Sequence, residues 1–284
     1  MTKTLLSFGH GYSACALARL LSDDWRVIGT TRSEDKAAEL MASGTEPRIW
    51  PGADLTPALN TATHLLISAG PSDAGDPVLN ELRHEIEARR EQFEWVGYLS
   101  TTGVYGDHNG DWVDETTPLT PSTKRGQLRV NAEADWQSLD LPLHIFRLAG
   151  IYGPGRGPFA KVRNGTARRI IKEGQVFSRI HVADIAQVLK ASIDQPNAGA
   201  IYNLCDNDPA PPEDVIGYAA ELLNLPIPPA QDFETADMTP MARSFYAESK
   251  KVRNDRIKDE LGVDLIYPDY RAGLQALLAA ETNP

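Results

Sequence analysis

The feature that most constrains the fold lies at the N-terminus, where a short apolar run ends at Phe8 and a Gly-x-Gly-x-x-Ala turn follows. The turn is made by Gly9, Gly11 and Ala14, and a helical pattern of apolar residues comes directly after it. A strand, a tight turn and a helix in this order are the context of a dinucleotide-binding fingerprint. In such a turn the first glycine permits the sharp bend, the second lets the backbone approach a pyrophosphate, and the small third residue lets the helix pack closely.

The start of that helix also favours an anion, because its N–H groups are free and its dipole is positive there. We therefore expect the loop to contact the dinucleotide. The alternative is a glycine-rich turn of an α/β protein that binds nothing. The predicted contacts of the loop are Gly9, His10, Gly11, Tyr12 and Ser13.

Composition excludes several classes of partner. The chain has 284 residues and a net charge of −11, which argues against nucleic acid and anionic membranes as partners. Its two cysteines, Cys15 and Cys205, lack the spacing of a metal site, so no metal is predicted, and Cys15 is expected to be a small core residue. No apolar run reaches membrane length, and the N-terminus lacks the basic region of a signal peptide. A cytoplasmic location is the expectation.

The end of the second predicted strand, 25–31, bears on cofactor choice. An NAD-selective protein usually places Asp or Glu there, on the ribose 2′-hydroxyl. This chain has Thr31, Arg32 and Ser33, and a guanidinium flanked by hydroxyls suits a 2′-phosphate. We therefore predict NADP in preference to NAD. The alternative is that Arg32 is a solvated cation and that Glu34 or Asp35 reaches the ribose.

Apolar strand patterns alternate with helical patterns as far as residue 148, which predicts a doubly wound parallel sheet, an α/β Rossmann fold. Ligands of such sheets bind at the carboxyl ends of the strands. Small residues end the strands near 67 and 101, and we expect them under the cofactor. They are Ser68, Ala69, Gly70 and Ser100.

The pattern changes after residue 148, where a glycine- and proline-rich loop is followed by a basic helical stretch, 161–172. Most of these cations are expected to be solvated, with one or two facing an anionic substrate. Further on, Asp184 is predicted to cap a helix, and two late helices are expected near 248–261 and 270–280. We predict a dinucleotide-binding core over 1–154, to which 176–206 return, and a smaller substrate-side lobe from 155–175 and 207–284.

Five stretches together resemble the extended short-chain dehydrogenase/reductases, the NAD(P)-dependent epimerase/dehydratase family. They are the glycine loop and residues 99–106, 146–155, 180–186 and 201–206. The resemblance implies that Thr101, four residues before the tyrosine of Val-Tyr-Gly, binds the reacting oxygen. It also implies nicotinamide contacts from Gly150 and Ile151, an adenine contact from Asp54 unless that side chain only makes a turn, a small-molecule substrate, and a possible homodimer.

One departure from the family concerns its Tyr-x-x-x-Lys helix, in which lysine lowers the tyrosine pKa and the phenol passes a proton. When the helix is aligned on Glu133, Arg125 occupies the tyrosine position and Arg129 the lysine position. A guanidinium stays protonated, so Arg125 cannot exchange a proton as tyrosine does. Arg125 is suited to a carboxylate or phosphate, and Arg129 to ribose hydroxyls.

A literal Tyr-x-x-x-Lys occurs at Tyr246–Lys250, far along the chain, and we interpret it as a chance match at a helix start. Other possible proton donors are Tyr105, Tyr152 and His181, each of which also suits a structural role. Two functions follow from the sequence. One is an NADP-dependent oxidoreductase or epimerase-like enzyme with a non-standard proton donor; the other is a non-catalytic NADP(H) sensor or regulatory module. A fold that has lost its cofactor is a weaker third possibility, which the intact glycine loop opposes.

Overall fold

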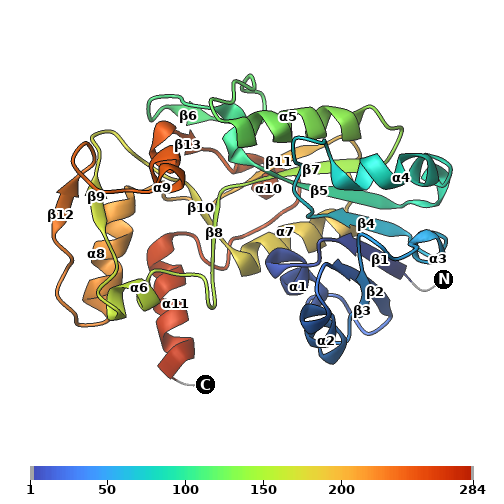
Figure 1. Cartoon of the computed structure of the whole chain (residues 1–284), viewed down its shortest axis with the longest axis horizontal. Coiled ribbons are helices and arrows are strands. Elements are labelled where there is room, and N and C mark those ends of the chain that lie inside the picture. The colour runs from blue at the N-terminus through green and yellow to red at the C-terminus, as the bar shows by residue number, and fades with distance from the viewer. Residues whose placement is uncertain (1–2, 283–284) are drawn as a thin grey trace.

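In the computed structural model, which describes residues 3–282, seven parallel strands form one sheet flanked by helices on both faces (Figure 1). The predicted α/β Rossmann class is therefore confirmed. The strand order is β11-β7-β5-β4-β1-β2-β3, so the chain reverses its direction of winding between β1 and β4. The strands are β1 (Lys3–Phe8), β2 (Trp25–Thr31), β3 (Glu46–Ile49), β4 (His64–Ile67), β5 (Trp95–Thr101), β7 (Leu143–Leu148) and β11 (Ile201–Leu204).

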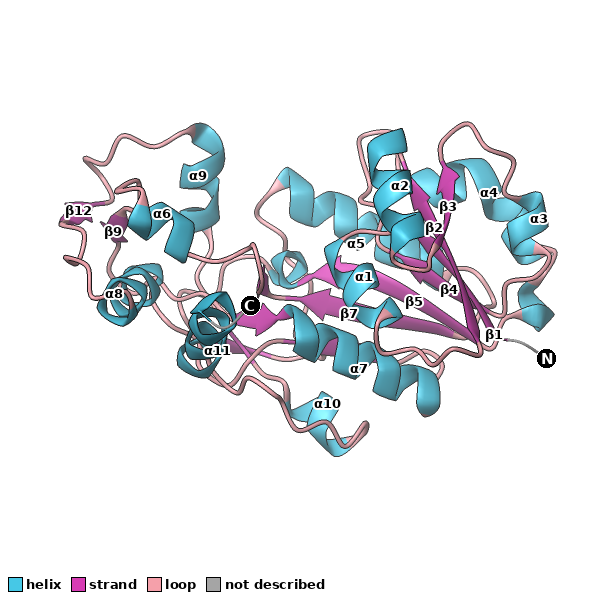
Figure 2. Ribbon diagram, turned by 90° about the horizontal axis from the view of Figure 1, so that it is seen from below, coloured by secondary structure: helices cyan, strands magenta, loops and turns pink. Residues whose placement is uncertain are grey.

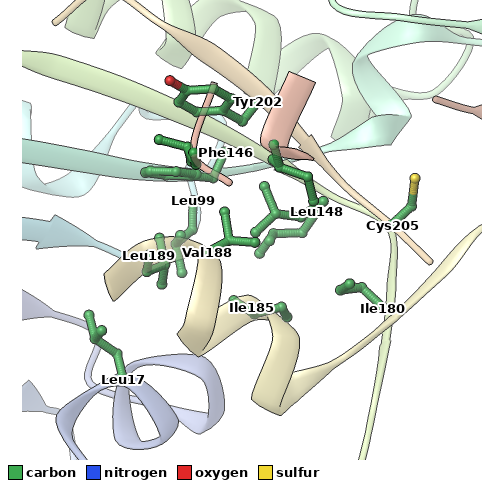
Figure 3. Packing of buried hydrophobic residues seen from close by; sticks show 14 of the residues in the cluster. Leu17, Leu99, Phe146, Leu148, Ile180, Ile185, Val188, Leu189, Tyr202 and Cys205 are labelled. Carbon is green, nitrogen blue, oxygen red and sulfur yellow. The ribbon is translucent and has the colours of Figure 1, made fainter. Parts of the chain in front are cut away.

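The strands are buried on both faces because neighbouring residues along each strand join different cores. Leu5 packs with α1 and α7 on one face, whereas Leu6 packs with α3, α4 and α5 on the other. Leu17 and Val188 belong to the first core (Figure 3). The helices are α1 (Tyr12–Ala18), α2 (Glu34–Ala42), α3 (Thr56–Leu59), α4 (Pro77–Glu87), α5 (Lys124–Gln137) and α7 (Val182–Asp194).

Most of the remaining elements extend beyond the carboxyl ends of the central strands (Figures 1 and 2). A third core there includes Tyr152, Phe159 and Leu274, whereas Val113, Val252 and Ile257 belong to the first core. Two-stranded pairs join β10 to β8, β12 to β9 and β13 to β6. The helices and short strands are β6 (Trp112–Val113), β8 (Gly150–Tyr152), α6 (Phe159–Arg163), β9 (Arg169–Ile171), β10 (Arg179–His181), α8 (Pro212–Leu222), β12 (Ala230–Asp232), α9 (Pro240–Ser244), β13 (Lys251–Val252), α10 (Asp255–Asp259) and α11 (Tyr270–Thr282), with 3-10 turns η1 (Arg90–Gln92), η2 (Thr102–Tyr105) and η3 (Phe245–Ala247).

Three local predictions were wrong. The basic stretch is helical only to Arg163, because Gly165 adopts a positive φ of 65° and the chain then enters β9. The helix expected from 248 is reduced to α10, since β13 pairs with β6 first. Asp184 does not cap α7, because His181 does so and Asp184 lies inside the first turn.

Candidate functional site

The glycine loop joins β1 to α1 at the reversal point of the sheet. Gly9 has a φ of +72°, and a Cβ there would lie 3.0 Å from the Ala69 nitrogen, so both conformation and space require glycine. The Gly9 N–H donates to Thr30 Oγ1 at 2.8 Å and the His10 N–H donates to the Thr30 carbonyl at 2.9 Å. Thr30 therefore fixes the loop from β2. Sequence reasoning missed this residue, although a threonine near the end of a buried strand was a signal.

Beyond the bend, Gly11 begins α1 without a side-chain cap, and the first N–H groups of a helix have no partners within it. A Cβ on Gly11 would have only the Gly9 carbonyl oxygen nearby, at 3.6 Å, so the space outside this glycine is open. Ala14 is buried against the core, as its small size predicts, whereas Cys15 is only half-buried. The loop thus presents an open, uncapped helix start, a geometry that fits a pyrophosphate.

The His10 side chain turns inward instead of toward the open side of the loop. Its Cβ lies 2.8 Å from where a Cβ on Gly29 would be, so the ring is packed over β2. Burial, and secondarily Lys36, lowers the pKa of His10 to about 4, and within residues 3–282 neither ring nitrogen has a hydrogen-bond partner. Any contact of His10 with a ligand would therefore come from its main chain.

The end of β2 presents three predicted contacts. The Ser33 hydroxyl accepts from the Lys36 N–H at 3.2 Å and caps α2, while Thr31 Oγ1 accepts from the Ser33 N–H at 3.4 Å. Arg32 is exposed. At the next strand, Asp54 accepts from the Thr56 N–H at 2.9 Å, a bond that lowers the pKa of its carboxyl. Asp54 thus makes a turn, and its predicted adenine contact stays a prediction.

Arg129 reaches the sheet edge between β4 and β5. Its Nη1 donates to the Leu99 carbonyl, and its Nη2 would lie 3.4 Å from a Cβ on Gly70. The loop that contains Ser68 and Ala69 is itself held by β1, because both N–H groups donate to the Phe8 carbonyl. The structure therefore brings Arg129 next to residues 68–70, the segment that packs beside the glycine loop. Arg125, one turn earlier on α5, is exposed.

A buried polar network fixes α5 below this edge. Ser100 Oγ donates to Glu133, and Arg147 donates to both Glu133 oxygens. Arg147 Nη1 also donates to the Tyr105 hydroxyl at 3.0 Å, which in turn donates to Asn203 at 2.7 Å. The Ser100 hydroxyl is thus used inside the protein, and only its main chain could meet a cofactor.

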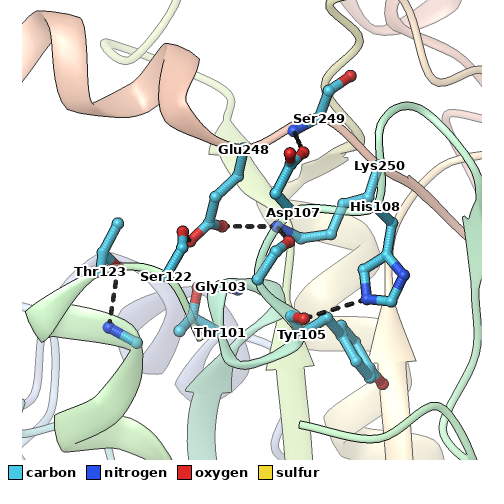
Figure 4. Close-up of polar contacts among 12 residues, drawn as sticks. Thr101, Gly103, Tyr105, Asp107, His108, Ser122, Thr123, Glu248, Ser249 and Lys250 are labelled. Atoms are coloured by element: carbon cyan, nitrogen blue, oxygen red, sulfur yellow. Dashed lines mark hydrogen bonds and ion pairs between the residues drawn. The ribbon is translucent and has the colours of Figure 1, made fainter. Parts of the chain in front are cut away.

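Thr101 ends β5 and is half-exposed at the edge of the sheet (Figure 4). Its Oγ1 accepts from the Gly103 N–H at 3.2 Å, so it caps the turn η2 that carries the Val-Tyr-Gly sequence. Gly150 and Ile151 lie in β8, which follows β7 and pairs with β10. These residues occupy the carboxyl ends of the strands, where the prediction placed them.

The three proposed proton donors have structural surroundings. Tyr105 is fully buried in the network above, and burial raises its pKa to about 12. Burial also raises the Tyr152 pKa, and its hydroxyl donates to the Asp269 carbonyl at 3.4 Å. His181 Nδ1 accepts from the Ala183 N–H at 3.1 Å, and burial lowers the His181 pKa to about 4.

The Tyr-x-x-x-Lys sequence at 246–250 does not form the helix start that was predicted. Tyr246 lies in η3, Glu248 is extended, and residues 248–250 belong to no helix or strand before β13 begins. Lys250 Nζ donates to the Gly106 carbonyl at 2.7 Å and pairs with Glu248 at 2.6 Å. Lys250 thus reaches the end of the turn that Thr101 caps (Figure 4).

Asp184 has a different role from the one predicted. Its carboxylate accepts from the Ile266 N–H at 2.6 Å and the Tyr267 N–H at 3.3 Å, and burial raises its pKa to about 6. It therefore ties the segment before α11 to α7. Across residues 3–282, no group of His, Cys, Asp and Glu side chains is arranged to hold a metal, and no helix is long and apolar enough to cross a membrane.

The sheet order, the glycine loop and the small-residue strand ends define the class: the fold is that of the NAD-dependent epimerase/dehydratases of the extended short-chain dehydrogenase/reductase superfamily. No family model matches the chain. The chain is 30% identical to protein YeeZ of Escherichia coli K12 over 283 residues, which is 94% of this chain and 97% of that protein. It therefore belongs to the same family as YeeZ.

Solved structures agree with this placement. A functionally unknown conserved protein from Silicibacter pomeroyi DSS is 64% identical, covers 98% of this chain and 99% of its own, and gives a TM-score of 0.95. A protein provisionally described as an NAD-dependent epimerase/dehydratase, from Methylobacillus flagellatus, is 27% identical over 99% of both chains, with a TM-score of 0.72. UDP-glucuronic acid 4-epimerase from Bacillus cereus, solved with NAD, shares the fold at 15% identity and a TM-score of 0.78 over 99% of both chains.

Proposed function

We propose that this protein binds a nicotinamide dinucleotide along the carboxyl edge of its sheet and acts as an oxidoreductase or epimerase-like enzyme on a small polar, anionic substrate. The observation that carries the proposal is the glycine loop: Gly9 has a positive φ and packs closely on Ala69, and Gly11 is open at an uncapped helix start. The description of the M. flagellatus protein and the NAD bound to the B. cereus epimerase support the same cofactor class.

The residues that would hold the dinucleotide follow the strand order. Thr31 to Ser33 and Asp54 would contact the adenosine, Gly9 to Ser13 the pyrophosphate, and Ser68 to Gly70 would lie beside it. Arg129, Gly150 and Ile151 would contact the nicotinamide side. The strand order supports this assignment. When bound there, the nicotinamide would supply or accept a hydride. Thr101 would hold the substrate oxygen, and the exposed Arg125 would hold a substrate carboxylate or phosphate.

For cofactor choice we propose NADP, because Arg32 is an exposed guanidinium at the end of β2. The test is a calorimetric titration of the wild type and Arg32→Ala with NADPH and NADH. A charged contact to the 2′-phosphate is worth about 1.5–3 kcal/mol, so Arg32→Ala should weaken NADPH binding by that amount and leave NADH binding unchanged. Equal affinities of the wild type for both would refute the preference, and binding of neither would refute the cofactor proposal.

The second candidate is a non-catalytic NADP(H) sensor, and the arginines on α5 are the observation that favours it. Arg125 and Arg129 cannot exchange protons at usable pH. A sensor would bind NADPH and NADP⁺ unequally and couple that difference to another protein. Turnover of any substrate with NADPH would rule it out.

A further inference from the structure

Lys250 and Glu248 form an ion pair to which the proposed function assigns no role. The Nζ and Oε2 atoms lie 2.6 Å apart, and only 10% and 12% of the two side chains are exposed. Withdrawing two charges from water is costly, and such a pair seldom adds net stability. Its place in the structure therefore needs another explanation.

A series of contacts connects this ion pair to the turn that begins at Thr101, the residue proposed to hold the substrate oxygen. Lys250 Nζ donates to the Gly106 carbonyl, which follows η2, the turn capped by Thr101. Ser122 Oγ donates to Glu248 Oε1 at 2.7 Å, two residues before α5 begins. Gly126 of α5 packs back on η2, because a Cβ there would lie 2.7 Å from the Gly103 carbonyl oxygen. Figure 4 shows the pair beside the turn that begins at Thr101.

Anchoring of the C-terminal segment does not depend on these two side chains, because Ser249 and the main chain already provide it. The Ser249 N–H donates to Asp107 at 2.8 Å, and its carbonyl accepts from the His108 and Gly110 N–H groups. Its hydroxyl donates to the Gly174 carbonyl at 2.8 Å. The Glu248 carbonyl accepts from Gln175 at 2.7 Å. Changes at Lys250 should therefore leave the segment in place.

The chemistry of the proposed function requires a proton donor at this edge. Reduction of a carbonyl transfers a hydride from the reduced nicotinamide to the carbonyl carbon. The substrate's carbonyl oxygen then carries a negative charge and must take up a proton. Tyr105, Tyr152 and His181 are held in structural contacts, and Arg125 cannot release a proton.

We propose that Lys250 is this donor: an Nζ–H bond breaks, the substrate O–H bond forms, and the neutral amine regains a proton from solvent. Glu248 holds the ammonium in position, and Thr101 holds the oxygen. The inference rests on the proposed function, since it requires the hydride. The three donors of an ammonium allow this geometry, because Gly106 and Glu248 account for two of them.

The first test is a binding measurement that does not depend on turnover. Side-chain resonances of isotope-labelled lysine would be followed by NMR while NADP⁺ is added, with the Lys250 signal identified by its loss in Lys250→Arg. The Lys250 resonance should shift, whereas that of Lys190, paired with Asp194 on α7, should not. An unshifted Lys250 resonance in protein saturated with NADP⁺ would overturn the inference.

The second test separates proton donation from charge, using NADPH with a panel of small aldehydes and α-keto acids as probes. Lys250→Met and Lys250→Arg should both lower kcat by at least about 100-fold, since a guanidinium keeps the charge but not the proton exchange. Lys190→Met should turn over as the wild type does. NADPH affinity should be unchanged in all three variants. Lys250→Arg and Lys190→Met should keep the wild-type unfolding temperature. Lys250→Met leaves Glu248 without its ion-pair partner and should lower the unfolding temperature, so its turnover is measured below that temperature.

Three results would count against the donor role. Turnover retained by Lys250→Arg would assign Lys250 a charge role only, and turnover retained by Lys250→Met would remove any role. Failure of the wild type to reduce any probe while it binds NADPH would refute the inference and leave the dinucleotide site standing. Failure to bind NADPH or NADH would instead refute the proposed function itself.

Discussion

Glu133 and Arg147 face each other beneath the site, with Oε2 and Nη2 2.7 Å apart and only 2% and 3% of the side chains exposed. The pair joins α5 to β7, and Ser100 and Tyr105 complete it from β5 and η2. Arg129 lies one turn before Glu133 on the same helix. The position of the candidate ribose contact therefore depends on this buried pair.

Removal of one partner should be strongly destabilising because it leaves the other charge buried and unpaired. We expect Arg147→Met to lower the free energy of unfolding by about 3–5 kcal/mol in urea denaturation. The double variant Glu133→Gln/Arg147→Met should recover part of that loss. The surface pair Lys190–Asp194 is the control, and Asp194→Asn should cost less than about 1 kcal/mol. Equal losses for Arg147→Met and Asp194→Asn would show that the buried pair has no special role.

The glycine loop offers a substitution that separates folding from binding. Gly11→Ala should fold normally, because a Cβ there has open space and no positive φ, but it should weaken NADPH binding at least about tenfold by obstructing the pyrophosphate. Calorimetry and thermal unfolding measure the two effects. Undiminished NADPH affinity in Gly11→Ala would contradict the proposed position of the pyrophosphate.

Unlike Gly11→Ala, Gly9→Ala should lower the free energy of unfolding, because it adds both a strained φ and a close contact with Ala69. Gly44 is its matched control, with a φ of +83° and nothing within 4 Å of a Cβ. In urea denaturation, Gly44→Ala should lower the free energy of unfolding by about 1–2 kcal/mol from strain alone, and Gly9→Ala should lower it by more. Equal costs would mean that the approach of Gly9 to the loop after β4 is not tight.

The sheet was predictable because the information that specifies it is local. The strand at 25–31 was predicted with the bounds that the structure gives, and the strand end near 101 lies where it was predicted, since buried residues run along both strands of the parallel sheet. The turn at Gly9 was predictable because only glycine tolerates its conformation. Helix ends depend on capping side chains, as at α2, where Ser33 supplies the cap before Glu34.

The parts that were missed depend on contacts between distant residues. Thr30 accepts a hydrogen bond from Gly9, which is 21 residues away in the sequence, and Asp184 accepts one from Ile266, which is 82 residues away. Lys250 reaches Gly106 across 144 positions, and no local pattern could place it there. That Arg125 replaces the family's tyrosine stays a prediction from the sequence, but only the fold could show which residues lie near Thr101.

Four buried histidines make acid stability a specific prediction. Burial lowers the pKa of His10, His64, His144 and His181 to about 4, against about 6.5 unfolded. Between these values the unfolded chain binds more protons, so the histidines' contribution to stability is lost as the pH falls from about 6.5 to 4.

Five carboxyls oppose the histidines, because burial also raises the pKa of Asp76, Glu115 and Glu213. Burial raises the pKa of Asp184 to about 6 and that of Asp206 to about 8, so the folded state binds more protons there and their contribution falls as the pH rises. The four histidines should therefore make the wild type less stable as the pH falls from about 6.5 to 4, and these carboxyls reduce that loss.

Urea denaturation from pH 7 to 4 checks the slope. His144→Gln should reduce it by about one proton while keeping an acceptor for the Asn197 N–H, which His144 Nε2 accepts at 2.9 Å. A pH-independent stability of the wild type over this range would contradict the assignment of neutral histidines to the folded state, and an unchanged slope in His144→Gln would exclude His144 from it.

The two arginines of α5 provide the last test of the site, because they lie one turn apart in different surroundings. Arg129 is half-buried against Gly70 and the Leu99 carbonyl, whereas Arg125 is exposed. We expect Arg129→Met to weaken NADPH binding by roughly 1.5–3 kcal/mol, the usual contribution of a charged hydrogen bond, and Arg125→Met to leave it unchanged. Arg125→Met should instead raise the KM of an anionic substrate with little effect on kcat, since uniform binding is lost. Calorimetry gives the first result and steady-state kinetics the second. If Arg125→Met rather than Arg129→Met weakened NADPH binding, α5 would have to present its other arginine to the cofactor, and the alignment of this helix on Glu133 would be wrong.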